Sequence, residues 1–195
     1  MFDTETIDQL AKTLKEPSWL TELRRKALVR HAQLPWPHPS DDIWRRTDVS
    51  LLDPAQGFSP TPPSLLQAIP LSDAQLAGLT QPLGREQLFV RANGAWVSRA
   101  PAQGIVVEDL TQAVSHQPDS IRHAIEADGF SDAEQKLSTL NTAFHHDDLV
   151  VQVPPSFTTA APIRLVHLLS AAPKQAIFPM TVITVGAGSS ITLID

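Results

Sequence analysis

The chain has 195 residues, a net charge of -6 and no cysteine. The negative charge argues against a general nucleic-acid binder, because neutralising phosphates requires clustered Lys and Arg. The missing cysteine excludes disulfides, thiolate metal ligands and a cysteine nucleophile within these residues. With no apolar signal segment at the N-terminus and no stretch near the roughly 20 apolar residues that span a bilayer, we expect a cytoplasmic chain that binds no membrane.

Two helices are predicted at the N-terminus. Apolar residues recur at helical spacing from Thr4 to Leu14, with Asp3 or Thr4 as the N-cap. Pro17 ends this pattern and opens a second helix, because proline is tolerated in a first turn. The apolar stripe of the second helix comprises Leu20, Leu23, Ala27, Leu28, His31 and Leu34. A helical hairpin is expected, and its basic cluster is interpreted as a solvated helix face: Arg24, Arg25, Lys26 and Arg30.

The next segment, about residues 45–70, is rich in proline and is expected to be irregular. Trp44 at its start is interpreted as a packing anchor. A short helix from Ser72 carries a capping box with Gln75, in which each side chain bonds the backbone N–H of the other residue. Asn93-Gly94 predicts a type I′ hairpin turn between strands at 88–92 and 95–98.

A strand at Gly104–Val107 and helices near 109–116 and 118–127 are expected next, with Asp109 capping the first helix. A second capping box, Ser131 to Glu134, opens a further helix. That helix is expected to bury Ala133, Leu137, Leu140 and Phe144. Together these elements predict a helical or α+β domain over residues 1–140.

Residues 141–195 form a β segment. Its predicted strands are Leu149–Val153, Pro162–Leu169, Thr181–Val185 and Ser190–Ile194. Short strands separated by turns are typical of a sandwich, a barrel or a solenoid, and the irregular gaps and abrupt end favour a solenoid. The last strand would expose unpaired N–H and C=O groups. We therefore expect an incomplete coil whose open edge is covered by a longer chain or by a second copy in a homo-oligomer.

The densest cluster of polar ligand types is His145-His146-Asp147-Asp148. Adjacent residues of an extended strand point to opposite faces, so these side chains cannot easily converge on one metal ion. A polar turn entering the strand at Leu149 is the favoured interpretation. The remaining histidines are also assigned structural roles: His31 is expected to be buried and hydrogen-bonded, and no nucleophile–base spacing surrounds His116, His123 or His167.

Gly186 to Ser190 is similar to a phosphate loop in its glycine content. The lysine of such loops is missing, and a strand follows rather than a helix that would hold the phosphate at its N-terminus. This segment is therefore interpreted as a turn. No catalytic, cofactor-binding or metal-binding residue is predicted in the chain, and no enzyme activity is expected.

Three stretches, in this order along the chain, carry a resemblance to a known family. The first is Glu16-Pro17-Ser18-Trp19-Leu20-Thr21-Glu22-Leu23-Arg24-Arg25-Lys26-Ala27-Leu28, followed by Leu34-Pro35-Trp36-Pro37 and Trp44-Arg45-Arg46-Thr47-Asp48. The second is Leu140-Asn141-Thr142-Ala143-Phe144, followed by Val151-Gln152-Val153-Pro154 and Pro162-Ile163. The third runs from Ile183-Thr184-Val185-Gly186 to Ser190-Ile191-Thr192-Leu193-Ile194-Asp195. These motifs resemble the SufB/SufD family of iron–sulfur cluster assembly scaffolds, and the N-terminal set is similar to its SufD branch more than to its SufB branch. His145 to Asp148 depart from the more apolar, glycine-containing turn of the family.

The resemblance implies an α+β N-terminal domain followed by a right-handed parallel β-helix, of which residues 141–195 are the first rungs, so that the chain is truncated. It also implies a non-catalytic subunit of the SufBCD complex that helps to acquire iron. A SufB-like paralogue and a SufC-like ATPase, which binds ATP, would be its partners through regions mostly beyond residue 195. The family's cluster-forming residues lie in later rungs, so none is assigned here.

Two other classes of function stay open at this stage. The first is a free-standing interaction module whose exposed β edge captures an extended partner. The second is a solenoid that binds or cleaves carbohydrate with paired carboxylates. The β segment offers only Asp147, Asp148 and Asp195 for that chemistry, which makes the second class remote.

Overall fold

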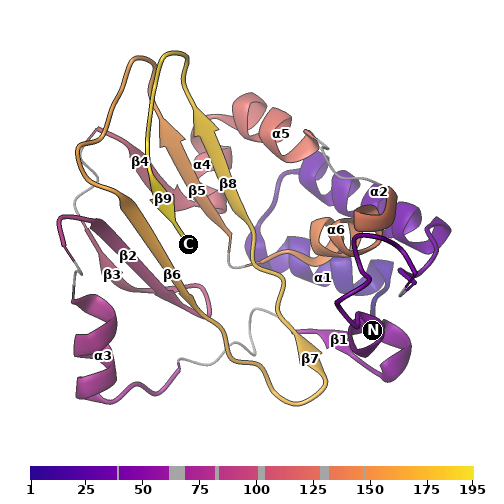
Figure 1. Ribbon diagram of the computed structural model, residues 1–195. Coiled ribbons are helices and arrows are strands. Elements are labelled where there is room, and N and C mark those ends of the chain that lie inside the picture. Colours follow the sequence, from indigo (N-terminus) through magenta and orange to yellow (C-terminus); the bar gives the residue numbers. More distant parts are fainter. Residues whose placement is uncertain (39, 62–68, 82–83, 101–103, 128–131, 147) are drawn as a thin grey trace. The chain divides into compact units, whose positions relative to one another are not determined.

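The computed structural model describes residues 1–38, 40–61, 69–81, 84–100, 104–127, 132–146 and 148–195 (Figure 1). The chain divides into two compact units, each built from three segments. We call them the helical unit (Met1–Leu65, Ile125–His146 and Ala171–Met180) and the strand unit (Leu66–Ala124, Asp147–Ser170 and Thr181–Asp195). The boundary expected near residue 140 stays a prediction. In the described ranges, no helix is both long and apolar enough to cross a membrane.

The two N-terminal helices are confirmed. Helix α1 (Thr4–Leu14) begins where the Asp3 carboxylate accepts a hydrogen bond from the Thr6 backbone N–H at 2.8 Å. It ends at Lys15, whose left-handed backbone (φ 55°) returns its N–H to the last helical carbonyls. Helix α2 (Ser18–Gln33) opens directly after Pro17 and ends before Leu34.

The third long helix of the helical unit, α6 (Asp132–Phe144), packs along α2. The predicted capping box at Ser131 and the predicted burial of Ala133 fall outside what the structure describes. Leu140 and Phe144 are buried as expected, and Leu137 is half-buried. The apolar core between the three helices contains Ile7, Ala27, Leu140, Ala143 and Phe144.

An aromatic cluster completes this core. Phe2, Phe144 and Phe178 meet with ring centroids 5.0, 5.9 and 6.2 Å apart. Phe178 comes from residues 171–180, which also contain β7 (Gln175–Ala176), and β7 pairs in parallel with β1 (Ser59–Pro60).

The stretch at about residues 45–70, which was expected to be irregular, contains strand β1 and two single-turn 3₁₀ helices. These helices are η1 (Ser50–Leu52) and η2 (Pro54–Gln56). Residues 62–68 of this stretch lie outside the described part.

In the strand unit the predicted hairpin is confirmed. Strands β2 (Gln87–Ala92) and β3 (Ala95–Arg99) are joined by Asn93 and Gly94 with φ of 46° and 86°. Helix α3 (Asp73–Thr80) begins with the expected Ser72–Gln75 capping box.

Two later expectations need correction. Strand β4 (Val106–Asp109) starts two residues beyond the predicted one, and it precedes helices α4 (Leu110–His116) and α5 (Pro118–Glu126). Asp109 stands at the N-cap of α4 but makes no cap hydrogen bond, because its carboxylate accepts from the Arg91 guanidinium and the Trp96 indole instead.

In the described part of the strand unit, seven strands form two open sheets, in the orders β3-β2-β6-β9 and β4-β5-β8. The predicted strands are confirmed as β5 (Leu149–Val153), β6 (Ile163–Leu168) and β8 (Thr181–Val185). Only a short β9 (Leu193–Ile194) and a bridge at Ser190 represent the last one. The core takes side chains from both sheets and from Ile105, which precedes β4. Its sheet residues are Phe89, Val107, Leu149, Val151, Val153, Ile163 and Leu165.

Residues 181–194 repeat the course of residues 149–164. In parallel register, Leu149 pairs with Thr181, Val153 with Val185 and Thr158 with Ser190, so each residue meets the one 32 positions later. Ile163 then pairs with Leu193. The turns stack as well, because Gly186 N–H donates to Val153 O at 2.8 Å and Ser190 N–H to Phe157 O at 2.9 Å. The turn predicted at 186–190 is confirmed.

Candidate functional site

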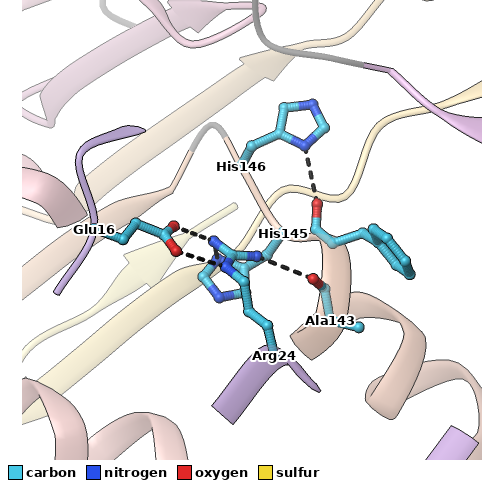
Figure 2. Close-up of polar contacts among 6 residues, drawn as sticks. Glu16, Arg24, Ala143, His145 and His146 are labelled. Carbon is cyan, nitrogen blue, oxygen red and sulfur yellow. Dashed lines mark hydrogen bonds and ion pairs between the residues drawn. The ribbon is translucent and has the colours of Figure 1, made fainter. Parts of the chain in front are cut away.

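A buried ion pair lies at the centre of the helical unit (Figure 2). The Arg24 side chain on α2 is 0% exposed and donates to both oxygens of Glu16, at 2.9 Å from Nε and 2.5 Å from Nη2. Its Nη1 donates to the carbonyl of Ala143 at 3.3 Å, and Nη2 lies 3.4 Å from Nδ1 of His145. Because a guanidinium only donates, His145 accepts through Nδ1.

The sequence-based assignment of Arg24 to a solvated face is therefore wrong, whereas Arg25, Lys26 and Arg30 are exposed. Leu20, Arg24 and Ala27 are three or four residues apart, so they share one face of α2, and all three are buried. The spacing of Arg24 from Leu20 and Ala27 was the signal in the sequence that Arg24 is buried. The run of basic residues around Arg24 favoured the solvated interpretation instead.

The segment after α6, predicted as a polar turn that enters the strand at Leu149, has buried side chains at His145, His146 and Asp148. His145 and His146 are 0% and 1% exposed. His146 Nδ1 donates to Phe144 O at 3.0 Å, and its backbone N–H donates to Phe178 O at 2.9 Å. Figure 2 shows the two imidazoles pointing away from each other. Asp148 is buried in the strand unit, and Asp147 lies outside the described residues.

This cluster anchors helices and offers little for catalysis. Nε, Nη1 and Nη2 of Arg24 all donate to groups of the chain itself, and the paired carboxylate is 5% exposed. Over the ranges that the structure describes, no group of three His, Cys, Asp or Glu side chains could hold a metal ion. The arrangement fixes α2 to the loop after α1 and to the end of α6.

A second buried cation, Arg91 on β2, organises the strand unit. It donates to Asp148 O at 2.9 Å, Gly94 O at 2.7 Å and Asp109 Oδ1 at 2.9 Å. Its guanidinium lies 5.1 Å from the centre of the Trp96 ring, and the Arg99 guanidinium lies 5.0 Å from the same centre, so both make cation–π contacts with Trp96. Sequence reasoning missed Arg91, because Asp109 and Asp148, two of its three partners, lie 18 and 57 residues away along the chain.

The other histidines have separate environments. His116 and His123 are exposed. The His167 side chain is 13% exposed, with Nε2 3.7 Å from Asp195 Oδ1. Burial lowers the pKa of His167, and Asp195 offsets part of this effect. The pairing of β6 with β9 brings these two residues together, which no local sequence pattern indicates.

His31 is hydrogen-bonded as expected but half-buried. Its Nδ1 donates to Lys136 O at 2.9 Å, while Lys136 Nζ donates to the carbonyls of His31 and Leu34 at 2.7 and 2.8 Å. Lys136 thereby caps the last carbonyls of α2. Burial lowers the pKa of the His31 imidazole below its ordinary 6.5, and the hydrogen bond to Lys136 offsets part of that shift.

Replacing His31 by asparagine should flatten the pH dependence of stability below neutrality. A histidine with a lowered pKa binds more protons when unfolded, so its contribution is present above the ordinary 6.5 and is lost as the pH falls through the lowered value. Asparagine keeps a donor for Lys136 O and does not titrate. Urea unfolding at several pH values measures the effect. The exposed His123→Asn is the control; equal curves for both variants would contradict the prediction.

The outer edges of β8 and β9 form a candidate interaction surface. Among the described residues, β8 pairs only with β5 and β9 only with β6. Their outer N–H and C=O groups have no strand neighbour there, and Ile183, Val185 and Ile194 are 41%, 51% and 46% exposed. Such an edge is a template for pairing with another strand.

Comparison with known proteins gives one informative relative. No family model matches the chain. The chain is similar to the iron–sulfur cluster assembly protein SufD of Bacillus subtilis (strain 168), with 23% identity over 198 residues. The alignment covers 99% of this chain and 44% of that protein, so the chain spans less than half the length of the relative. The match supports a SufB/SufD-like relationship.

Proposed function

We propose that this chain is the N-terminal module of a SufD-like subunit of a SufBCD complex, a non-catalytic scaffold for iron–sulfur cluster assembly in the cytoplasm. The main support is the match to SufD along 99% of the chain. The chain contains no cysteine, so the thiolates that hold the cluster as cargo would come from elsewhere in the complex. Its own contribution is then architectural.

The proposal includes a right-handed parallel β-helix that begins in the strand unit. The 32-residue register between β5 and β8, continued at Thr158 and Ser190, supports it, because a solenoid stacks each rung on the previous one. The outer edges of β8 and β9 would receive the next rung. A SufB-like paralogue and a SufC-like ATPase would bind later parts of the subunit, and the complex would acquire iron and use ATP.

Co-expression of the full-length subunit with SufB-like and SufC-like proteins tests this proposal. We expect the three proteins to co-purify and the subunit to restore cluster assembly in cells that lack their own SufD. Co-purification measures binding to the partners, and restored cluster assembly measures function, so the two results are scored independently. A full-length, folded subunit that neither binds the partners nor restores assembly would contradict the proposal.

The exposed edge supports a second candidate, in which β8 captures an extended strand of another protein or of a second copy. Gel filtration of the full-length subunit, alone and with a SufB-like partner, distinguishes the two. A stable monomer that joins SufB and SufC favours the scaffold. A concentration-dependent dimer that Ile183→Lys abolishes favours capture of a second copy, because a charge on an edge strand opposes pairing.

A further inference from the structure

The hairpin turn of the strand unit carries a chemically reactive pair. The chain has two asparagines, Asn93 and Asn141, and only Asn93 precedes a glycine. Asparagine is thermolabile, because the backbone nitrogen of the next residue can attack its side-chain carbonyl carbon. Glycine has no Cβ to hinder that approach. Asn141 lies within α6 and precedes the β-branched Thr142, so it provides an internal reference.

The structure fixes the Asn93 carboxamide with two hydrogen bonds to one residue. Its Nδ2 donates to Ser170 O at 3.0 Å, and its Oδ1 accepts from Ser170 N–H at 2.8 Å. We call these two hydrogen bonds the Asn93–Ser170 latch. They continue the parallel pairing of β2 with β6, which ends at Ala92 and Leu168. Attack by Gly94 N needs Asn93 Cγ to move to bonding distance of that nitrogen, and the latch resists this movement.

We propose that Asn93 is a deamidation site whose rate is set by the Asn93–Ser170 latch. Gly94 N loses its proton to water or hydroxide and bonds to Asn93 Cγ. Nδ2 takes up a proton from water, the Cγ–Nδ2 bond breaks and ammonia leaves, giving a succinimide. Water then opens the ring at either carbonyl carbon and yields aspartate or isoaspartate. Asn93 is half-exposed at the hairpin tip.

The product keeps one hydrogen bond of the latch and loses the other. The new carboxylate still accepts from Ser170 N–H, but the oxygen that replaces Nδ2 faces Ser170 O with no hydrogen to donate. Isoaspartate also inserts an extra backbone carbon into a turn whose two residues already need positive φ. Deamidation therefore loosens the end of β6 against the hairpin.

Ageing of the full chain at mildly alkaline pH, followed by peptide mapping, tests the proposal. We expect residue 93 to convert while Asn141 does not, with isoaspartate detected by an isoaspartyl methyltransferase. Ser170→Pro removes the N–H donor and should raise the rate roughly fivefold, the factor for one ordinary hydrogen bond. Ser170→Ala keeps the N–H and C=O and should leave the rate unchanged.

Circular dichroism checks that Ser170→Pro is folded. If it is not, the wild-type rate in low urea decides, because the latch should open locally before the chain unfolds. A rate that rises well below the unfolding midpoint supports the proposal. A rate that stays constant up to the midpoint, equal rates for the two Ser170 variants, or equal conversion at Asn93 and Asn141 would overturn it.

Discussion

Replacing Gly186 by alanine is expected to lower the free energy of unfolding by about 3 kcal/mol, the upper range for inserting a methyl group into a packed site. A Cβ on Gly186 would lie 2.4 Å from Pro155 N and 2.7 Å from the Pro154 carbonyl carbon. Both atoms belong to the backbone of the turn below, so they cannot rotate away. The stacked turns must separate, and the hydrogen bond from Gly186 N to Val153 O is lost with them.

Gly78→Ala is the matched control, because nothing lies within 4 Å of a Cβ at that position of α3. It should be neutral or stabilising by up to about 1 kcal/mol, the helix preference of alanine over glycine. Urea unfolding measures the free energy of unfolding of both variants. Amide hydrogen exchange then shows whether the lost stability lies at β8 and β9. Equal stabilities for the two variants would show that the turns at 154–157 and 186–190 are not in contact.

Arg24→Met is expected to cost about 3–5 kcal/mol of stability, because it leaves Glu16 buried without its cation. The carbonyl of Ala143 and the His145 ring lose a donor in the same step. Glu16→Met should lower the stability by a similar amount, because it leaves the Arg24 guanidinium buried without its carboxylate partner. The double variant should recover most of the loss, since a buried ion pair is often replaced by apolar side chains at little net cost.

Chemical denaturation of the four proteins of this cycle gives the coupling energy directly. Arg25→Met is the control, as its partner Asp8 is about half exposed and such pairs contribute about 0–1 kcal/mol. Losses at Arg24 that match those at Arg25, or additive losses in the double variant, would show that the Arg24 pair is solvated and weak.

The sequence predicted the elements whose signals are local. The N-cap at Asp3 or Thr4, the break at Pro17 and the positive-φ pair at Asn93-Gly94 each act within a few residues. The structure places the cap at Asp3 and confirms the other two. Apart from the β2–β3 hairpin, the strand pairings were not predicted. A two-residue strand such as β7 has no periodicity, and its partner β1 lies more than a hundred residues away.

The candidate site was missed for the same reason. Glu16 is near Arg24 in sequence, but Ala143 and His145 reach it only when α6 packs on α2. A run of arginines and lysine looks solvated when each residue is weighed alone. Its position on the apolar stripe shows which of them must be buried.

The return of residues 171–180 to the helical unit bears on the order in which the chain folds during synthesis. Phe178 completes the aromatic cluster with Phe2 and Phe144, and it follows β6 along the chain. Although domains generally fold in the order in which they leave the ribosome, this helical core, which includes Phe2, is completed only after Phe178 has emerged. A nascent chain stalled before Phe178 should therefore leave Phe2 and Phe144 accessible to chaperones.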